Sequence, residues 1–321
     1  MFDEELLSIK PETFQSLTPT KKFDDTSNRI TDLSYSEDGK GLIVSAEDVV
    51  IVYDLTEGTK SKNIPCGKYG CDVIEYADSE TCLLSSTKCD NQVRLLSLQK
   101  KSYVRYFPGH TKEVNCIQIH PKDHSTFLTS SQDQTIRFWD KRSFDNFAFL
   151  NIHAVPLIAF DPEGLLFAVA TRSDSIKLFD MRSFDLGPFQ TFRVMKNDDD
   201  EWTSIEFSPC GKFILVSTSA GGVKWIDAFL GKVIHNFAEH SNQMNIPLRA
   251  TVSSDSEYVM VGSADRQIYV YSTGSGEVVC RLQTPYTPPS HIVAFNQKQF
   301  LMTSISSEVY LWAPHEEYSQ H

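Results

Sequence analysis

Short apolar runs alternate with turn residues along almost the whole chain. One set of runs ends in an aromatic or aliphatic residue followed by Asp, Ser or Ala: VVIVYD (to Asp54), QVRLLS (to Ser97), TIRFWD (to Asp140), SIKLFD (to Asp180), GVKWID (to Asp227), QIYVYS (to Ser272) and EVYLWA (to Ala313). These runs are rich in β-branched and aromatic residues, and no helical period of comparable strength competes with them. The pattern predicts short β-strands.

Two further sets of runs come ahead of this one in every unit. The first set is ITDLSY, DVIEYA, VNCIQI, PLIAF, TSIEF, RATV and HIVAF, and the second is GLIVSA, CLLSST, FLTSS, LLFAVA, FILVST, YVMVGS and FLMTSI. Several junctions between them hold turn residues, as in SEDGK (36–40), DPEG (161–164) and SPCGK (208–212). Glycine at such a junction can take the positive φ of a tight hairpin. Each unit is therefore expected to fold as an antiparallel sheet.

The spacing of the units decides the architecture. The penultimate residues of the seven terminal runs, from Tyr53 to Trp312, are separated by 40 to 47 residues. A self-similar period of this length, with four strands in each unit, is typical of a β-propeller. The seven units predict an all-β, seven-bladed propeller that occupies residues 1–321 as a single domain.

The two ends of the chain indicate how the propeller closes. The last unit stops at its third strand and only a short polar tail, 314–321, follows it, whereas residues 14–23 precede the first unit and have no place in it. A sheet edge left unpaired invites aggregation. We therefore expect part of residues 14–23 to form the outer strand of the last blade.

Composition and charge limit the classes of function. The chain has 30 basic and 42 acidic residues, a net charge of −12, and no basic cluster longer than two residues, so we expect no direct binding to nucleic acid. No run approaches the roughly 18 apolar residues of a membrane span, and the N-terminus MFDEELLSIK does not resemble a secretory signal. The seven cysteines form no CxxC pair and mostly fall in apolar runs. They are interpreted as reduced, buried thiols of an intracellular protein.

One repeat carries a constellation of polar residues at a characteristic spacing. His110 precedes the first strand, Thr129 and Ser131 lie on one face of the second, Asp133 follows it, and Trp139 lies on the third. This arrangement resembles the WD-repeat family, in which these positions form a buried hydrogen-bonded network. The resemblance implies that His110, Asp133 and Trp139, with Thr129 or Ser131, stabilise the blade and catalyse nothing.

Other candidates for catalysis or metal binding are weaker. His120 and His124 flank Pro121, which forbids the helix that would bring both onto one metal ion, so a turn is expected there. No P-loop, GxSxG or HExxH motif occurs, and we expect no cofactor, no metal and no enzymatic activity. The acidic run NDDDE (197–201) could hold Ca²⁺ or Mg²⁺, but it lacks the ligand spacing of calcium loops and fits a solvated loop better.

The amino-acid sequence of several segments is more specific than the general pattern of a WD repeat. These segments are KYGCDVIEYA (68–77), RYFPGH (105–110), FDPEGLLFAVA (160–170), MRSFDLGPFQTF (181–192), EWTSIEFSPCGKFILVST (201–218) and IDAFLGKVIHNF (226–237). They resemble the Swd2/WDR82 family, and the sixth repeat, which has no clear His–Asp pair, fits more loosely. The resemblance implies a nuclear scaffold in the COMPASS histone methyltransferase complex and in the cleavage and polyadenylation factor or a related protein phosphatase 1 assembly. It also implies roles in transcription termination and an indirect link to the RNA polymerase II tail.

Two other classes of function stay open, because a fold does not fix a function. Some propellers are enzymes that act in the central channel. The inner runs SIKLF, GVKWI and LLFAVA, however, contain few ionisable side chains that could act together as catalytic acids, bases or metal ligands. A histone-tail reader or the substrate receptor of a ubiquitin ligase is equally compatible with the fold, and the acidic net charge leaves basic-tail binding open. The duplicated Arg-Ser-Phe-Asp at 142–145 and 182–185 is interpreted first as turn chemistry and second as a peptide-binding element.

Propellers usually bind peptides on the loops that enter their innermost strands. In this chain those loops hold the candidate partner-binding residues Lys68, Tyr69, Lys112, Glu113, His153, Asp199, Asp200, Glu201 and Trp202. Tyr69 and Trp202 are the expected aromatic anchors, since interface energy concentrates in such residues, and Asp199 and Glu201 are expected to meet basic side chains of the partner. The alternative is that Trp202 caps its strand and Tyr69 packs beneath its loop.

Overall fold

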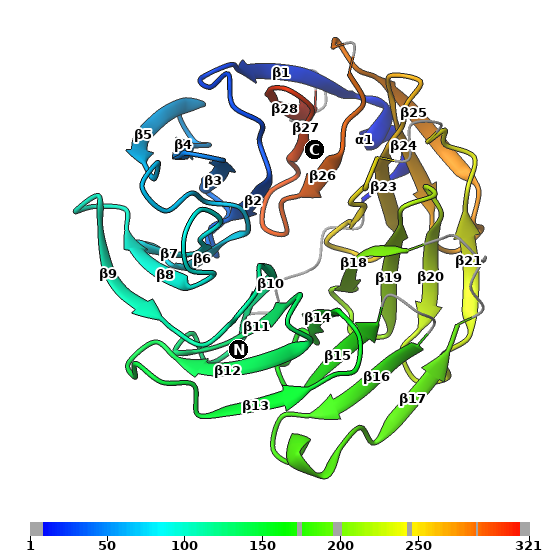
Figure 1. Cartoon of the computed structure of the whole chain (residues 1–321). Helices are drawn as coiled ribbons and strands as arrows, with labels where there is room; N and C mark the ends of the chain where they lie inside the picture. Colours follow the sequence, from blue (N-terminus) through cyan, green and yellow to red (C-terminus); the bar gives the residue numbers. More distant parts are fainter. Residues whose placement is uncertain (1–8, 172–174, 195–200, 243–245, 287, 315–321) are drawn as a thin grey trace, which may run out of the picture. The chain divides into compact units, whose positions relative to one another are not determined.

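The computed structural model describes residues 9–171, 175–194, 201–242, 246–286 and 288–314. Within these residues the chain forms 28 strands, one short helix, α1 (Pro11–Gln15), and one 3-10 turn, η1 (Phe184–Leu186). The strands make seven four-stranded antiparallel sheets, as the repeats predict, and the fold is a seven-bladed β-propeller (Figure 1). The sheets are called blades one to seven in chain order. The chain divides into two compact units, residues 26–195 and residues 1–25 with 196–321, which are described in turn.

The unit of residues 26–195 holds blades one to four, and in each blade consecutive strands are neighbours. Blade one is β2 (Asp32–Tyr35), β3 (Gly41–Ala46), β4 (Val49–Asp54) and β5 (Thr59–Pro65), and blade two is β6 (Ile74–Asp78), β7 (Thr81–Ser85), β8 (Val93–Ser97) and β9 (Ser102–Phe107). Blade three is β10 (Val114–Ile119), β11 (Thr126–Ser131), β12 (Thr135–Asp140) and β13 (Ala148–Asn151), and blade four is β14 (Pro156–Phe160), β15 (Leu166–Thr171), β16 (Ser175–Asp180) and β17 (Gln190–Arg193). In Figure 1 these blades run from blue through cyan to green.

The other unit holds blades five to seven. Blade five is β18 (Trp202–Phe207), β19 (Phe213–Thr218), β20 (Val223–Asp227) and β21 (Val233–Phe237), and blade six is β22 (Thr251–Val252), β23 (Tyr258–Gly262), β24 (Gln267–Ser272) and β25 (Val278–Gln283). Blade seven is β26 (Ile292–Phe295), β27 (Met302–Ile305), β28 (Val309–Pro314) and, as its outer strand, β1 (Leu17–Phe23).

The outer strand of blade seven comes from the N-terminal segment, which confirms the expectation for residues 14–23. β1 pairs antiparallel with β28, from Leu17 opposite Pro314 to Phe23 opposite Val309. The strand starts later than residue 14 because Pro11 begins the short helix α1. Phe14 at the end of that helix is fully buried, with its ring 4.6 Å from that of Tyr258.

Burial along the strands explains the sequence pattern. Middle strands such as β8 and β11 are buried on nearly all positions, because neighbouring blades of the same unit pack on both of their faces. Outer strands such as β9 alternate between exposed and buried positions. At the predicted hairpins Gly39 and Gly164 have φ values of 70° and 71°, which glycine adopts without the steric penalty of a Cβ.

The structure corrects the expectation that the cysteines are generally buried. All seven are free thiols; Cys66, Cys71 and Cys82 are buried, and Cys116 and Cys280 are half-buried. The two others, Cys89 and Cys210, are exposed because they lie in loops between strands, where no second sheet covers them. Over the described residues no helix has the length and apolar character to cross a membrane.

Candidate functional site

A chain of hydrogen bonds runs through blade three and joins its strands to the loop before β10. The Trp139 indole N–H donates to Thr129 Oγ1 (2.8 Å), and His110 Nε2 lies 2.7 Å from the same hydroxyl. His110 Nδ1 lies 2.8 Å from Asp133 Oδ2. Because the carboxylate must accept, Nδ1 carries the proton and Nε2 accepts from Thr129. The sequence left open whether Thr129 or Ser131 belongs to the network, and the structure places Thr129 in it.

The electrostatics of this network keep the carboxyl charged and the imidazole neutral. Burial raises the pKa of Asp133, but hydrogen bonds from Thr135, His110 and the Thr111 N–H outweigh that effect and lower it to about 2. Burial lowers the pKa of His110, although the Asp133 carboxylate opposes that shift. A neutral imidazole held in one tautomer is suited to bridging two strands rather than to exchanging protons at neutral pH.

A hydroxyl, an imidazole and a carboxylate in sequence are also the parts of a nucleophilic triad. Here the hydroxyl of Thr129 is fully buried and already accepts a hydrogen bond from the indole N–H of Trp139, so no substrate carbonyl can approach it. What the network does is to position a loop: Ser131 Oγ donates to the carbonyl of Lys112 and accepts from the N–H of Asp133. This geometry supports the structural interpretation of the His–Asp pair.

The loop that this network holds presents charged side chains to solvent. Lys112 and Glu113 are exposed, and Glu113 accepts a hydrogen bond from Gln132 Nε2 (2.9 Å). His153, at the corresponding entry to blade four, is also exposed. These three predicted residues lie on loops that enter β10 and β14, and their side chains are available to a partner.

Tyr69 lies at the entry to blade two and is half-buried in a cationic cluster. The Arg94 guanidinium carbon is 3.8 Å from the centre of its ring, Lys68 Nζ is 4.8 Å from it, and Tyr103 packs edge-on at 5.4 Å. Arg94 forms a bidentate ion pair with Asp90 and lowers the pKa of that carboxyl. The tyrosine ring thus packs on Arg94, which is buried, while Lys68 beside it is exposed.

Arg94, Asp90 and Lys88 are parts of this cluster that the sequence analysis missed. Lys88 forms an ion pair with Asp48 and donates to the carbonyl of Gly67 (3.3 Å). A signal for Arg94 existed, because QVRLL aligned on TIRFW places it opposite Arg137 in the repeat. Together with Lys68, Tyr69, Lys112, Glu113 and His153, these side chains form what we call the loop surface of residues 26–195.

In blade five, Trp202 does not have the exposure expected of an aromatic anchor for a partner. Trp202, the first residue of β18, is only 1% exposed, so it cannot serve as an accessible anchor in this arrangement. The alternative, in which it caps its strand, describes its position better. Glu201 is exposed. Asp199 and Asp200, and with them most of the acidic run 197–201, lie outside the described residues.

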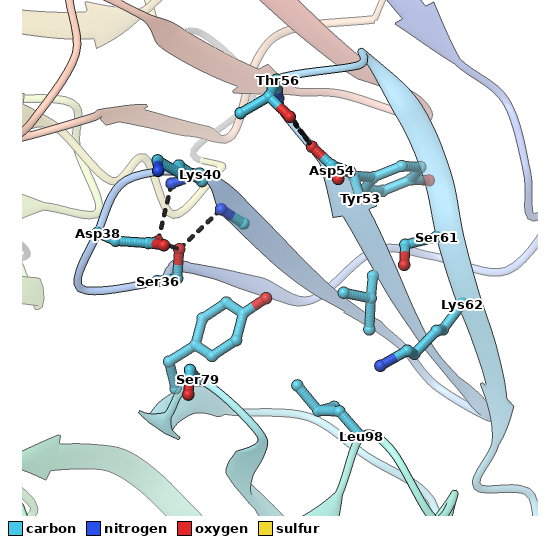
Figure 2. Close-up of a pocket in the computed structure, with 13 residues that line it drawn as sticks. Ser36, Asp38, Lys40, Tyr53, Asp54, Thr56, Ser61, Lys62, Ser79 and Leu98 are labelled. Carbon is cyan, nitrogen blue, oxygen red and sulfur yellow. Dashed lines mark hydrogen bonds between the residues drawn. The ribbon is translucent and has the colours of Figure 1, made fainter.

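A polar pocket of about 250 Å³ lies between the hairpins of blades one and two (Figure 2). Ser36, Asp38, Lys40 and Lys62 line one side, and Tyr76 of β6 lines the other. Asp38 accepts hydrogen bonds from Ser36 and from the N–H of Lys40, and the Ser36 hydroxyl lowers its pKa. The carboxylate is thus engaged in closing its own turn. Among the described residues, no cluster of three His, Cys, Asp or Glu side chains could hold a metal ion.

Two other groups of predicted residues lie in turns. His120 is half-buried, with Nδ1 accepting from the N–H groups of Lys122 and Asp123, and His124 is exposed 3.6 Å from Glu37. The two Arg-Ser-Phe-Asp segments make the same turn contact. In each, the backbone N–H of the arginine donates to the aspartate that ends the preceding strand, at 2.8 Å for Arg142 and 2.7 Å for Arg182. The segments therefore do contain duplicated turn chemistry.

The chain is similar to WD-repeat proteins over nearly its whole length. It is 37% identical over 305 residues to WD repeat-containing protein 82 of Drosophila melanogaster, covering 94% of this chain and 96% of the relative. It is 32% identical to the Set1 complex component swd2 of Schizosaccharomyces pombe (87% and 78%) and 29% identical to the COMPASS component SWD2 of Saccharomyces cerevisiae (87% and 89%). Residues 56–272 match a β-propeller family described as nucleolar protein 10-like, N-terminal domain.

Proposed function

Because the chain belongs to the WD-repeat family that includes WD repeat-containing protein 82 and Swd2, we propose that it is a non-catalytic scaffold subunit of a nuclear histone lysine methyltransferase complex. The match over 78% and 89% of the length of two relatives, named as a Set1 complex component and a COMPASS component, carries this proposal. A rigid set of blades with variable entry loops is suited to holding an extended segment of another subunit.

We assign the docking of that segment to the loop surface of residues 26–195. Tyr69 supplies an aromatic ring whose outer side can take an apolar or cationic group of the partner. Lys68 and Lys112 are exposed cations, and Glu113 and His153 add a carboxylate and a titratable ring. Such a mixture fixes the register of a bound segment through charge complementarity more than it adds raw affinity.

The first experiment tests membership of the complex. Tagged chain is purified from nuclear extract, and its stable partners are identified by mass spectrometry. Recovery of the catalytic methyltransferase subunit with its core partners is the expected result. Subunits of the cleavage and polyadenylation factor or of a protein phosphatase 1 assembly would add the second role in transcription termination. Recovery of ubiquitin ligase subunits, with no methyltransferase, would contradict the proposal.

The second experiment tests the loop surface. Tyr69→Ala is expected to weaken capture of the methyltransferase by about thirtyfold or more, since an aromatic anchor at an interface contributes about 2 kcal/mol or more. Tyr69→Phe retains the ring against Arg94 and separates loss of an anchor from loss of packing. Phe229→Ala, which removes a 71% exposed ring in blade five, is the matched control and should bind normally. Full binding by a folded Tyr69→Ala protein would place the interface elsewhere.

A further inference from the structure

Four arginines in the described residues stack on aromatic rings, and they fall into two classes. Arg94 stacks on Tyr69 and pairs with Asp90, and Arg281 stacks on Tyr269 (5.0 Å) and lies 3.5 Å from Glu239. Arg105 stacks on Phe144, and Arg137 stacks on Phe149. Among the described residues, neither of these two arginines forms an ion pair with a carboxylate. The unpaired arginines come from neighbouring blades, two and three.

Arg105 projects from the outer strand of blade two toward blade three. Its guanidinium carbon is 4.7 Å from the centre of the Phe144 ring, and Nη1 donates to the carbonyl of Lys141 (2.8 Å). The Phe144 side chain is 58% exposed, so the stacked pair lies at the surface. Stacking on the ring leaves the N–H edge of the guanidinium free for an acceptor.

Arg137 stands on β12 of blade three and makes the second pair. Its guanidinium carbon is 5.7 Å from the centre of the Phe149 ring, which is 54% exposed. Nη1 donates to Asn146 Oδ1 (2.8 Å), a neutral acceptor, while Nε is buried and has no partner among the described residues. A guanidinium held in this way still carries its full charge without a counter-charge.

Nearby carboxylates form no ion pair with the two arginines among the described residues. Asp140 lies close enough for Arg105 to contribute to lowering its pKa, but its oxygens accept a bidentate set of bonds from Arg142, which is the larger cause. Asp78 accepts from Lys141 Nζ (3.3 Å) and from the Thr81 hydroxyl. Both acids are engaged by their own neighbours, so neither forms an ion pair with Arg105 or Arg137, and each guanidinium keeps N–H groups beyond the one that bonds to Lys141 or Asn146.

The duplicated Arg-Ser-Phe-Asp segment shows that this exposure is local to blade three. In the second copy Phe184 is half-buried and stacks on Phe138 at 4.2 Å, filling the junction of blades three and four. In the first copy Phe144 stacks on Arg105 and is 58% exposed. The same turn thus half-buries its ring at one junction and leaves it accessible at the other.

We propose that Arg105, Phe144, Arg137 and Phe149, the Arg–Phe strip, bind an extended acidic segment of a partner protein that carries apolar side chains. The two guanidiniums take its carboxylates in charge-assisted hydrogen bonds, and the two rings take its apolar side chains. A net charge of −12 repels such a segment from most of the chain, so two cations that pair with no carboxylate of their own make this strip the favoured place for it. The same charge disfavours a nucleic acid, which needs many phosphate contacts.

The test is fluorescence anisotropy with a dye-labelled synthetic peptide in which Glu and Asp alternate with Phe and Leu. The whole chain should bind this peptide, and Arg105→Gln/Arg137→Gln should weaken binding about tenfold or more, as should Phe144→Ala. Arg281→Gln, a stacked arginine that has its own carboxylate, is the matched control and should bind like the wild type. Raising the salt concentration should weaken binding further.

Three outcomes would overturn the proposal. These are undiminished binding by the folded double variant, equal binding of a peptide with Lys in place of Glu and Asp, and tighter binding of a labelled oligouridylate than of the acidic peptide. If the double variant does not fold, peptide binding by Phe144→Ala serves as the test instead. This exposed ring, which stacks on Arg105, can be removed without disturbing the core.

Discussion

Blades three and six build the same corner of the repeat with different chemistry. In blade three His110 is joined to Asp133 on one side and, through the Thr129 hydroxyl, to Trp139 on the other. In blade six His240 precedes the first strand in the same way, yet its Nδ1 lies 3.0 Å from the hydroxyl of Tyr271. The two corners show that a repeat can keep its strands while its polar network is replaced.

The replacement follows from three positions of the repeat. When the two repeats are aligned on Asp133 and Asp265, Val261 of blade six takes the place of Thr129 and offers no bridging hydroxyl. Tyr271 takes the place of Trp139, and its longer polar tip reaches the histidine directly. Asp265 therefore accepts from the hydroxyl of Tyr269 (2.7 Å) instead of from an imidazole.

The difference has an electrostatic consequence. Burial lowers the pKa of both histidines, and for His240 it falls to about 4. His110 has a carboxylate in direct contact that opposes the shift, whereas for His240 the opposing effects are a backbone hydrogen bond with Gly221 and, more weakly, the charge of Asp265. We therefore expect the stability of blade six to respond to acid mainly through its histidine.

The largest expected effect comes from giving blade three the residue that blade six has. Thr129→Val leaves both His110 Nε2 and Trp139 Nε1 buried without a partner, and each such loss costs about 1–3 kcal/mol. We expect unfolding in urea to show a loss of about 2–5 kcal/mol. Thr129→Ser, which keeps the hydroxyl, is the control, and an equal loss in both variants would assign the effect to packing instead.

The second prediction uses pH to separate the corners. The pKa of His240 is about 4 in the folded chain against about 6.5 in an unfolded one, so protonation favours unfolding. The stability that neutral His240 contributes is complete above pH 6.5 and is lost as the pH falls toward 4, by about 3 kcal/mol. His240→Gln should flatten the pH dependence of the unfolding free energy in this window. An unchanged slope would contradict the assigned shift.

The third prediction concerns the carboxylate that only blade three couples to its histidine. Asp133→Ala should lower the free energy of unfolding by about 1–3 kcal/mol, because His110, Thr135 and the Thr111 N–H lose an acceptor. Binding of partners should be altered only as far as the loop of Lys112 is loosened. A variant with normal stability and abolished binding would mean that Asp133 touches a ligand directly.

The fold was predictable because strand identity follows from local patterns. Alternation, β-branched residues and turn glycines recur in most units, the spacing places the seven sheets, and the missing outer strand of the last unit places the N-terminal strand. His110, Asp133 and Trp139 were predictable for the same reason, since their positions in the repeat are fixed. The absence of a His–Asp pair in the sixth repeat was also foreseen, and the described residues of blade six show His240 bonded to Tyr271 instead.

Contacts between side chains far apart in the sequence were not predictable. The burial of Trp202 depends on what packs over β18, and the stacking of Arg94 on Tyr69 joins residues of a loop and of the third strand. A pattern of apolar and polar positions carries no information on such pairs, because exposed and buried aromatics look alike in it. The candidate binding residues were therefore predicted as loops and not as a surface.

The smallest expected effect tests whether Asp265 has any of the role of Asp133. Tyr269→Phe removes the hydroxyl that donates to Asp265 but keeps the ring that stacks on Arg281. Asp265 is exposed, so water can replace the lost donor, and we expect the hydrogen bond to its carboxylate to contribute only about 0.5–1 kcal/mol. We expect the melting temperature to fall by only a few degrees. A loss as large as that of Asp133→Ala would mean that the two aspartates hold their blades together equally, and that the rewired corner is no weaker than the one it replaces.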